Sequence, residues 1–395
     1  MIEAHRRQSI LFVDNRTEYF ISHRFPLALA AQRSGYDVHV TTLTSGDAAP
    51  IRAAGFSYHD IAPGKRDGSA RKELILLKRL LALYQGLQPD LLHHITLRAV
   101  AYGGLAGLTL KGTPGINSIT GLGYLFTASN PVTWVARKVL GAIFRVVLNR
   151  RRYRTTFQNV EDRRAFETSG WIRPGRAVVI PGSGVDPEHF KPLPPREGAP
   201  MVLFASRLLA HKGVREFVDA ARILRDFGLA ARFVIVGDSD PDNPAAIPMT
   251  RIEEWVGTGV VEYWGYRSDL RQVFAECAIV CLPSYREGVP KVLLEAAACG
   301  RAIVTTDVPG CRTAVARGEN GLLVPARDSE TLAVALRMLI EDRALRERMG
   351  AKGRERVERE FTVDRIVGAT LALYEECLRR QGTARGELRT HEGRA

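Results

Sequence analysis

The sequence has no uninterrupted apolar run of the roughly 18–20 residues that a membrane-spanning helix requires. Its first residues, Met1 to Ser9, are polar and do not resemble a secretory signal peptide. Both absences lead us to expect a protein that stays in the cytoplasm. The composition, 45% hydrophobic and 25% charged residues, is typical of a folded globular protein, and a length of 395 residues predicts two domains.

Cysteine is also scarce, with five residues, all in the second half of the chain. None belongs to a Cys-x-x-Cys pair, and their number is odd, which argues against a disulfide framework and against a zinc site. The carboxylates of Asp238, Asp240 and Asp242 are close enough in sequence to hold a divalent cation. Because they follow a strand and lie among prolines and Asn243, we expect a capped loop there instead.

The common nucleotide-binding fingerprints are missing. Gly121-Leu-Gly123 is not a dinucleotide motif, because no complete Gly-x-Gly-x-x-Gly follows the first strand. The segment 63–68 lacks the spacing and the Ser or Thr of a phosphate-binding Walker loop. NAD(P)-dependent chemistry is therefore disfavoured. Asn15, at the start of the loop after the first strand, is instead a candidate substrate-binding residue.

Acidic residues are absent between Asp90 and Glu161, where nine basic residues occur. Residues 1–195 hold 26 Lys and Arg against 14 Asp and Glu, whereas residues 196–395 hold 30 against 29. The excess of positive charge in the first half predicts an anionic partner there. Nucleic acid is disfavoured as that partner, because aromatic residues do not alternate with the cations as a stacking surface requires.

One helix, predicted over 133–154, carries most of these cations. Its apolar residues fall largely on one stripe: Trp134, Val135, Val139, Leu140, Ile143, Phe144, Val147 and Leu148. Its cations lie elsewhere and cluster at its end: Arg137, Lys138, Arg145, Arg150, Arg151, Arg152 and Arg154. Such a helix can lie on an anionic membrane surface. The alternative is that the stripe packs on the domain's own sheet and the arginines are solvated.

Short β-branched runs alternate with amphipathic stretches along the chain. Strands are expected at 10–14, 37–41, 90–94, 201–205, 232–237, 260–263, 278–282 and 302–305. This alternation predicts an α/β fold with two Rossmann-like domains, each a doubly wound parallel sheet, that face each other across a cleft. The domains expected are 1–190 and 201–360, with a proline-rich linker at 191–200, a closing helix at 361–380 and a flexible tail at 381–395.

The strongest motif is Ser-Tyr-Arg-Glu-Gly-Val-Pro-Lys-Val-Leu-Leu-Glu-Ala-Ala-Ala-Cys-Gly at 284–300. Its turn into a helix comprises Gly288, Val289, Pro290 and Lys291, with Pro290 expected at the first helical position. The free N–H groups and the positive dipole end of that helix suit a diphosphate. Glu287 is then expected near the hydroxyls of a transferred sugar and Glu295 near a ribose. The alternative is that both glutamates are surface charges.

Arg207 and Lys212 form a second candidate group. They follow the first strand of the second domain and precede a helix, where two fixed cations can neutralise a leaving diphosphate. Taken alone, such a basic pair is more often a surface feature. Its position at the carboxyl end of a strand favours a functional role.

Together these segments resemble the retaining, nucleotide-sugar-dependent glycosyltransferases of the GT-B fold, often called group 1 or family 4, over essentially the whole chain. The matching parts are Arg207 with Lys212, residues 181–186, Glu287 with Glu295, and residues 300–310. The resemblance implies that the glutamates bracket the donor, that the Arg/Lys pair binds its diphosphate, and that no metal or other cofactor is required. It also implies a front-face reaction, so no nucleophile is assigned.

Three further segments, 22–28, 119–124 and 305–312, are similar to the branch that builds glycans on polyprenyl diphosphate carriers. This resemblance implies a UDP-linked hexose or N-acetylhexosamine as donor and a polyprenyl-diphosphate-linked sugar as acceptor. It implies peripheral association with the inner face of the cell membrane, through the basic helix at 133–154. It also implies that the helix at 361–380 packs back on the first domain.

One departure from the family concerns Thr120, because many relatives carry a histidine before the Gly-x-Gly loop. A threonine cannot replace an imidazole as a base, so Thr120 and Gly123 are kept only as substrate-binding candidates. His93 is a possible substitute, although a histidine at a strand end is more often structural. Two other functions stay open: a sugar-nucleotide epimerase or hydrolase of the same architecture, and a non-catalytic nucleotide-sugar-binding partner of a transferase.

Overall fold

The computed structural model describes residues 6–64, 69–122, 131–192, 194, 198–241 and 243–392. The chain divides into two compact units, Met1–Ser183 with Ile366–Ala395, and Gly184–Arg365. The boundary lies before the predicted linker at 191–200. The reason is that Val185 already pairs within the second unit, where its N–H donates to the Phe361 carbonyl and its carbonyl accepts from the Val363 N–H, both at 2.9 Å.

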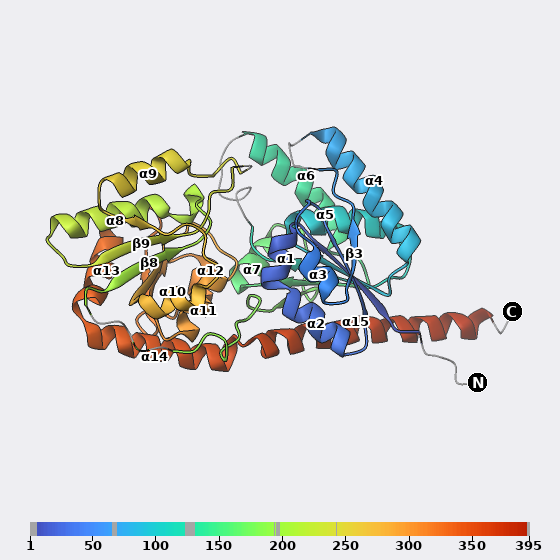
Figure 1. Ribbon diagram of the computed structural model, residues 1–395. Helices are drawn as coiled ribbons and strands as arrows, with labels where there is room; N and C mark the ends of the chain where they lie inside the picture. Colours follow the sequence, from blue (N-terminus) through green and yellow to red (C-terminus); the bar gives the residue numbers. More distant parts are fainter. Residues whose placement is uncertain are drawn as a thin grey trace. The chain divides into compact units, whose positions relative to one another are not determined.

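The first unit is built on a seven-stranded parallel sheet in the order β3-β2-β1-β4-β5-β6-β7 (Figure 1). Its strands are β1 Ser9–Asp14, β2 Asp37–Thr42, β3 Ser57–Asp60, β4 Leu91–Ile95, β5 Gly115–Ile119, β6 Tyr153–Phe157 and β7 Ala177–Val179. Its helices are α1 Thr17–His23, α2 Phe25–Arg33, α3 Ala49–Ala53, α4 Ala70–Leu87, α5 Leu97–Ala106, α6 Pro131–Val147, α7 Val160–Thr168 and most of α15 Val363–Glu392, with the short 3₁₀ helix η1 Gly107–Thr109 after α5.

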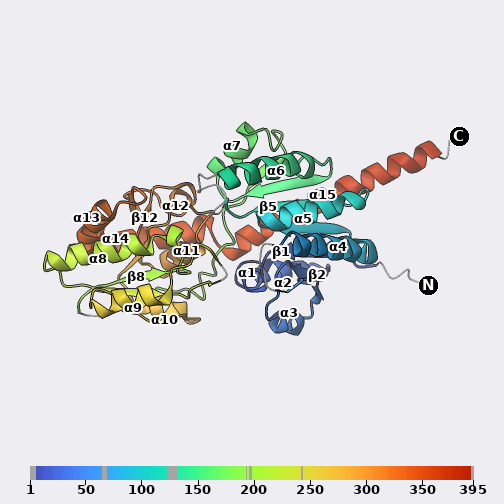
Figure 2. The ribbon, with the colours of Figure 1, turned by 90° about the horizontal axis from the view of Figure 1, so that it is seen from above.

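Alternation along β1 divides its side chains between the two faces of this sheet. Phe12 packs in one apolar cluster with Tyr374 of α15, and Leu11 packs in another with Leu80 of α4. Because the sheet is covered on both faces, its central strands are buried throughout, as the apolar runs in the sequence predict. Helix α15 thus completes the core of the first unit (Figure 2).

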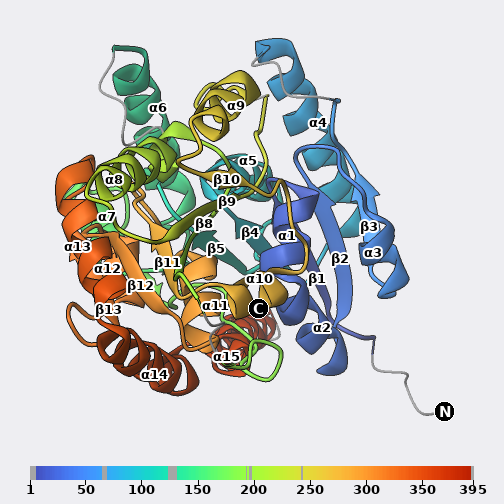
Figure 3. The same cartoon turned by 60° about the vertical axis from the view of Figure 1, so that its left-hand side comes forward.

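The second unit repeats this architecture with a six-stranded parallel sheet in the order β10-β9-β8-β11-β12-β13 (Figure 3). Its strands are β8 Met201–Ala205, β9 Arg232–Val236, β10 Glu262–Tyr263, β11 Ile279–Leu282, β12 Ala302–Thr306 and β13 Gly321–Val324. Its helices are η3 Ala210–Lys212, α8 Val214–Asp226, α9 Met249–Gly257, α10 Leu270–Glu276, α11 Lys291–Ala298, α12 Pro309–Ala314, α13 Ser329–Glu341 and α14 Arg343–Glu360. The predicted α/β fold with two Rossmann-like parallel sheets is confirmed.

The helix predicted over 133–154 is shorter than expected, because α6 ends at Val147 and β6 begins at Tyr153. The arginines assigned to its end are used by the fold instead. Arg150 donates to the Tyr153 hydroxyl at 2.6 Å, Arg152 donates to the Gly112 carbonyl at 2.6 Å, and Arg154 pairs with Glu376 of α15 at 3.1 Å. Within the described residues, no helix is long and apolar enough to cross a membrane.

The predicted tail at 381–395 is helical over its described part, since α15 continues to Glu392. Extending an existing helix adds one hydrogen bond per residue without a new nucleation step, and the segment contains no proline to stop it. All five cysteines are buried free thiols.

Candidate functional site

The predicted catalytic residues of the second unit lie on two loops, which follow the adjacent strands β8 and β11. Gly213, at the end of the first loop, has φ +78°, and a Cβ there would lie 2.1 Å from the Pro283 carbonyl oxygen of the second loop. The N–H of Tyr285 donates to the His211 carbonyl at 2.9 Å. Only glycine permits so close an approach of the two backbones.

Lys212 and Glu287 meet between these loops. The Lys212 Nζ lies 2.5 Å from the Glu287 Oε1, and the two side chains are only 16% and 10% exposed. A charge-assisted hydrogen bond of this kind is strong where water is largely excluded. Burial and the nearby Lys212 lower the pKa of His211 to about 4, so its imidazole is neutral near pH 7. The structure therefore brings two of the three predicted catalytic residues into direct contact.

Arg207, the third predicted catalytic residue, is 54% exposed and pairs with Asp240 at 3.3 Å. Asp238 accepts a hydrogen bond from the Ser239 N–H at 2.8 Å. These contacts fit the capped loop predicted at this position, and Asp242 lies outside the described residues. Among the residues that the structure describes, no group of three His, Cys, Asp or Glu side chains is arranged to hold a metal ion.

Helix α11 begins one residue later than predicted. Pro290 is its N-cap, with an extended ψ of 115°, so the first helical residue is Lys291. One turn further on, the Lys291 Nζ lies 3.1 Å from the Glu295 Oε1. Burial raises the pKa of Glu295, and the Lys291 cation opposes that shift. Glu295 is thus a buried carboxylate of the helix core, not a surface charge.

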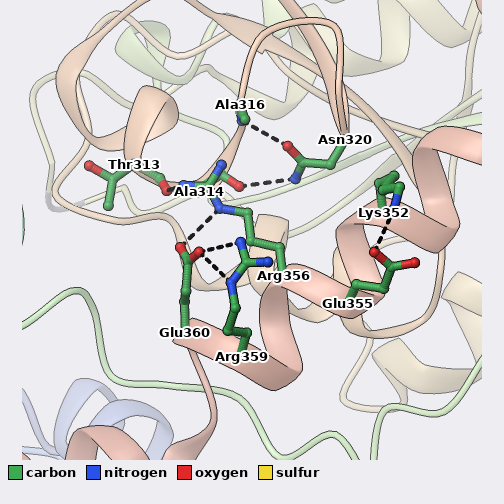
Figure 4. Close-up of polar contacts among 9 residues, drawn as sticks. All are labelled: Thr313, Ala314, Ala316, Asn320, Lys352, Glu355, Arg356, Arg359 and Glu360. Atoms are coloured by element: carbon green, nitrogen blue, oxygen red, sulfur yellow. Dashed lines mark hydrogen bonds and ion pairs between the residues drawn. The ribbon is translucent and has the colours of Figure 1, made fainter.

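The predicted turn residues Gly288 and Val289 are packed against α12. A Cβ at Gly310 would lie 1.8 Å from the Gly288 carbonyl oxygen and 2.6 Å from the Glu287 carbonyl oxygen. The other end of α12 is bound by α14, where Arg356 donates to the Thr313 carbonyl at 3.0 Å (Figure 4). Helix α12 therefore packs directly against the backbone of the Glu287 loop.

Figure 4 also shows how the polar contacts continue beyond α12. Arg356 pairs with Glu360 at 3.2 Å, and Asn320 bridges the Ala314 carbonyl and the Ala316 N–H at 3.2 and 2.7 Å. These bonds satisfy backbone groups at the carboxyl end of α12 that have no helical partner. They hold α12, and with it Gly310, in one position.

The substitution Gly310→Ala is expected to lower the free energy of unfolding by about 1–3 kcal/mol, because the methyl group has no space beside the Gly288 carbonyl. It is also expected to lower activity, since the Glu287 loop must move to relieve the overlap. Chemical denaturation measures the first effect. The control is Gly257→Ala at the end of α9, where a Cβ meets nothing within 4 Å, and equal losses in both variants would contradict this packing account.

The other predicted site residues belong to the first unit. Asn15 follows β1, and its side-chain oxygen accepts from Arg98 at 3.3 Å. Thr120 lines a polar cavity of about 10 Å³, large enough for about one water molecule, together with Arg24 and His93. Gly123 lies outside the described residues.

His93 has the geometry of a structural histidine. Its Nδ1 lies 2.6 Å from the Tyr374 hydroxyl, and its Nε2 lies 2.7 Å from the Ser118 hydroxyl. The side chain is fully buried, and burial holds its pKa well below the usual range. With both ring nitrogens occupied by the fold, its position does not favour contact with a substrate.

Two buried charged residues of the first unit were not predicted. Asp14 ends β1 and Arg24 is the N-cap of α2, and both are almost completely buried. Burial raises the pKa of Asp14 to about 7, although Arg24 and the Asn15 N–H oppose the shift. The sequence signal was present, since Asp14 ends a predicted apolar strand and faces the edge where ligands of such sheets bind.

The substitution Asp14→Asn is expected to raise the free energy of unfolding at about pH 8 by about 2–4 kcal/mol and to have little effect near pH 3.5. The Asp14 pKa is raised from 3.8 to about 7 in the folded state. The unfolded carboxyl therefore ionises first, and this group costs the folded state stability as pH rises between those values. Urea denaturation at both pH values measures the effect, and an equal gain at both would show that the raised pKa of Asp14 is not its cause.

Comparisons with known proteins agree with this architecture. Residues 199–342 match the family model described as glycosyl transferases group 1, and residues 9–157 match the model described as glycosyl transferase 4-like. The chain is similar to sucrose-phosphate synthase from Thermosynechococcus elongatus, with a TM-score of 0.76 at 21% identity over 94% of this chain and 99% of that one. It is also similar to Anabaena Alr3699/HepE in complex with UDP and glucose, with a TM-score of 0.74 at 18% identity over 93% and 100%. At these identities the likeness concerns the fold.

Curated relatives match over shorter stretches. The chain is 41% identical over 147 residues, 37% of each chain, to an N,N'-diacetylbacillosaminyl-diphospho-undecaprenol alpha-1,3-N-acetylgalactosaminyltransferase of Campylobacter jejuni. It is 33% identical over 229 residues to a D-inositol 3-phosphate glycosyltransferase of Stackebrandtia nassauensis, covering 53% of this chain and 51% of that protein. The chain thus spans 37% and 51% of the length of these two relatives.

Proposed function

Because the chain belongs to the GT-B superfamily of group 1, family 4-like glycosyltransferases, we propose that it transfers a hexose or N-acetylhexosamine with retention of configuration. The proposed donor is a UDP-sugar and the proposed acceptor a polyprenyl-diphosphate-linked glycan in surface polysaccharide or glycan biosynthesis. The observation that carries the proposal is the buried contact between Lys212 and Glu287 beside the start of α11. The name of the Campylobacter jejuni relative, which includes a diphospho-undecaprenol acceptor, supports the choice of acceptor.

The donor diphosphate is proposed to lie against Arg207, Lys212 and the N-terminus of α11. The two cations and the positive dipole end of α11 offset the negative charge that develops as the sugar leaves. Glu287 is proposed to accept hydrogen bonds from the hydroxyls of the transferred sugar, and Glu295, together with Lys291, to bind the ribose. Gly288, Val289 and Pro290 form the turn that precedes α11.

The proposed reaction breaks the bond between the anomeric carbon and the diphosphate oxygen. The acceptor hydroxyl oxygen forms the new bond on the same face of the sugar, and its proton passes to a phosphate oxygen of the departing UDP. Configuration is therefore retained, and no protein nucleophile is needed. Family resemblance is the support for this stereochemistry. Thr120 and Asn15 are kept as acceptor-binding candidates, in a role that a hydroxyl and an amide can fill without acting as a base.

The test is nucleotide release from UDP-, GDP- and ADP-sugars, with and without membrane extract that contains polyprenyl diphosphate sugars. Release from one donor that requires the acceptor is the expected result. Release without acceptor would favour the epimerase or hydrolase, and no release from any pair would favour a binding partner. The same panel with Glu287→Ala shows whether the release depends on this site.

We propose that helix α6 brings the enzyme to its lipid-linked substrate by lying on the anionic inner face of the cell membrane. The exposed side of α6 is apolar with two cations: Trp134, Val135, Lys138, Val139, Ala142, Arg145 and Val146. The opposite side, with Phe144 and Val147, packs in the core of the first unit. The predicted apolar stripe thus divides between core and surface, and an exposed apolar side with cations suits an anionic bilayer.

The double substitution Trp134→Glu with Val139→Glu is expected to weaken binding to vesicles of anionic phospholipid by about 10-fold or more, because two apolar groups lose their place in the bilayer. Vesicle co-sedimentation measures the binding, which should also weaken at high salt. Phe227→Glu, at an exposed apolar position of the second unit, is the control. Unchanged binding of the double variant would contradict the proposed role of α6.

A further inference from the structure

The loop that carries Glu287 has, besides its contact with Lys212 of η3, a polar attachment to α8, made by Tyr285. The Tyr285 hydroxyl donates to the Glu216 Oε1 at 2.5 Å. Glu216 lies in the first turn of α8 and is only 8% exposed. Burial and the Glu216 carboxylate raise the pKa of Tyr285 to about 12, so its hydroxyl stays protonated and remains a donor. The Tyr285 hydroxyl is therefore available as a donor near neutral pH.

This bond and the contact between Lys212 and Glu287 join the same two stretches of chain, residues 212–216 and 285–287. Glu216 follows Lys212 by four residues, and Tyr285 precedes Glu287 by two. Together with the bond from the Tyr285 N–H to the His211 carbonyl, it fixes both the backbone and the side chain of Tyr285 relative to α8. Helix α8 begins directly after Gly213, and Glu216 belongs to its first turn. The bond to Glu216 therefore fixes the position of the Glu287 loop relative to this helix.

Arg327 stacks over the tyrosine ring, and its guanidinium carbon lies 4.6 Å from the ring centroid. Arg327 has φ +64°, a left-handed conformation that is unfavourable for a residue with a side chain. The stacking of a cation on the ring restricts the ring further. Tyr285 is thus contacted both at its hydroxyl, by Glu216, and on its ring, by Arg327.

The burial of the Glu216 carboxylate does not favour the stability of the folded state. Its Oε2 is buried and has no hydrogen-bond partner within the part of the chain that the structure describes. A buried carboxylate with one unsatisfied oxygen is costly, and an apolar side chain of similar size would avoid that cost. A carboxylate at this position is therefore explained by the bond that it makes to Tyr285.

We propose that Glu216 is a positioning residue, which through Tyr285 holds the Glu287 carboxylate against Lys212. This inference rests on the proposed transferase function. Freed from α8, the 285–288 loop can shift, and Glu287 no longer stands where the transferred sugar requires it. Small displacements of a reacting group have large effects on rate, whereas donor binding by Arg207 and the α11 N-terminus does not depend on this bond.

The test compares Tyr285→Phe, Glu216→Ala and Glu216→Gln. The first two remove the hydrogen bond and are expected to lower kcat by about 10- to 100-fold while the KM for the donor changes by less than about 3-fold. Glu216→Gln keeps an oxygen that accepts from the Tyr285 hydroxyl, so it is expected to retain kcat within about 3-fold of the wild type. Tyr266→Phe, at an exposed tyrosine, is the matched control.

Hydrogen exchange of the 285–288 amides provides a readout that does not require catalysis. Measured well below the thermal midpoint of every variant, exchange is expected to be faster in Tyr285→Phe and Glu216→Ala, and unchanged in Glu216→Gln. If the wild type transfers no sugar, the transferase proposal fails while the exchange data still test the positioning role. Unchanged exchange in Tyr285→Phe and Glu216→Ala, or a kcat loss in Glu216→Gln as large as in Glu216→Ala, would overturn the inference.

Discussion

Glu287→Gln is expected to lower kcat/KM for sugar transfer by about 10²–10³-fold, with the loss in kcat. The substitution keeps the size of the side chain and removes its negative charge. An amide is a weaker acceptor for sugar hydroxyls, and it no longer holds the Lys212 ammonium 2.5 Å away in the largely water-free space between the loops. Steady-state kinetics with the donor identified by the nucleotide panel measures the effect.

The matched control is Glu188→Gln, which removes a carboxylate that is exposed and pairs with Lys191. Exposed ion pairs contribute little, so this variant should keep the stability and kinetics of the wild type. Nearly unchanged transfer by Glu287→Gln would show that Glu287 is not part of the reaction site. A similar loss of kcat/KM in both variants would indicate that the net charge of the protein, and not the Glu287 carboxylate, determines the rate.

Lys212→Met is expected to lower both the rate of sugar transfer and the free energy of unfolding. Transfer should fall by about 10²–10³-fold, because one cation that offsets the charge of the leaving diphosphate is missing. The free energy of unfolding should fall by about 3 kcal/mol, because the buried Glu287 carboxylate loses its partner. Activity assays and chemical denaturation measure the two losses separately.

The double variant Lys212→Met with Glu287→Gln separates the two roles of the pair. Neutralising Glu287 removes the unpaired buried charge, so most of the lost stability should return. Activity should not return, since both groups are missing from the site. A double variant that is as unstable as Lys212→Met would mean that the lysine stabilises the loops by packing, and not by its contact with Glu287.

The fold could be predicted from the sequence because it depends on local patterns. The buried strands β1, β8 and β11 are largely apolar runs of strand length, and they lie where the sequence predicts strands, at 10–14, 201–205 and 278–282. The end of α6 was missed for a physical reason. Tyr153–Phe157 contains an arginine and two threonines, which hid a buried strand whose Arg154 is satisfied by Glu376, far away in the sequence.

The candidate site was predictable where its residues follow one another in a motif. Glu287, Glu295 and Lys212 could be found in this way, and the structure adds that Lys212 and Glu287 touch. Contacts between segments that are far apart in the sequence could not be predicted, because no local sequence pattern indicates them. The bond from Tyr285 to Glu216 joins residues 69 positions apart, and the need for glycine at Gly310 comes from a carbonyl of another loop.

The most direct measurement is the transfer of an isotope-labelled sugar from its UDP donor into an extractable polyprenyl-diphosphate-linked product, with the anomeric configuration of the new bond read by NMR. The account predicts label in the lipid product only when both donor and acceptor are present, an α linkage from an α-linked donor, and very little product with Glu287→Gln. Product of inverted configuration would contradict the front-face reaction. Loss of the donor without any lipid product would contradict transfer itself.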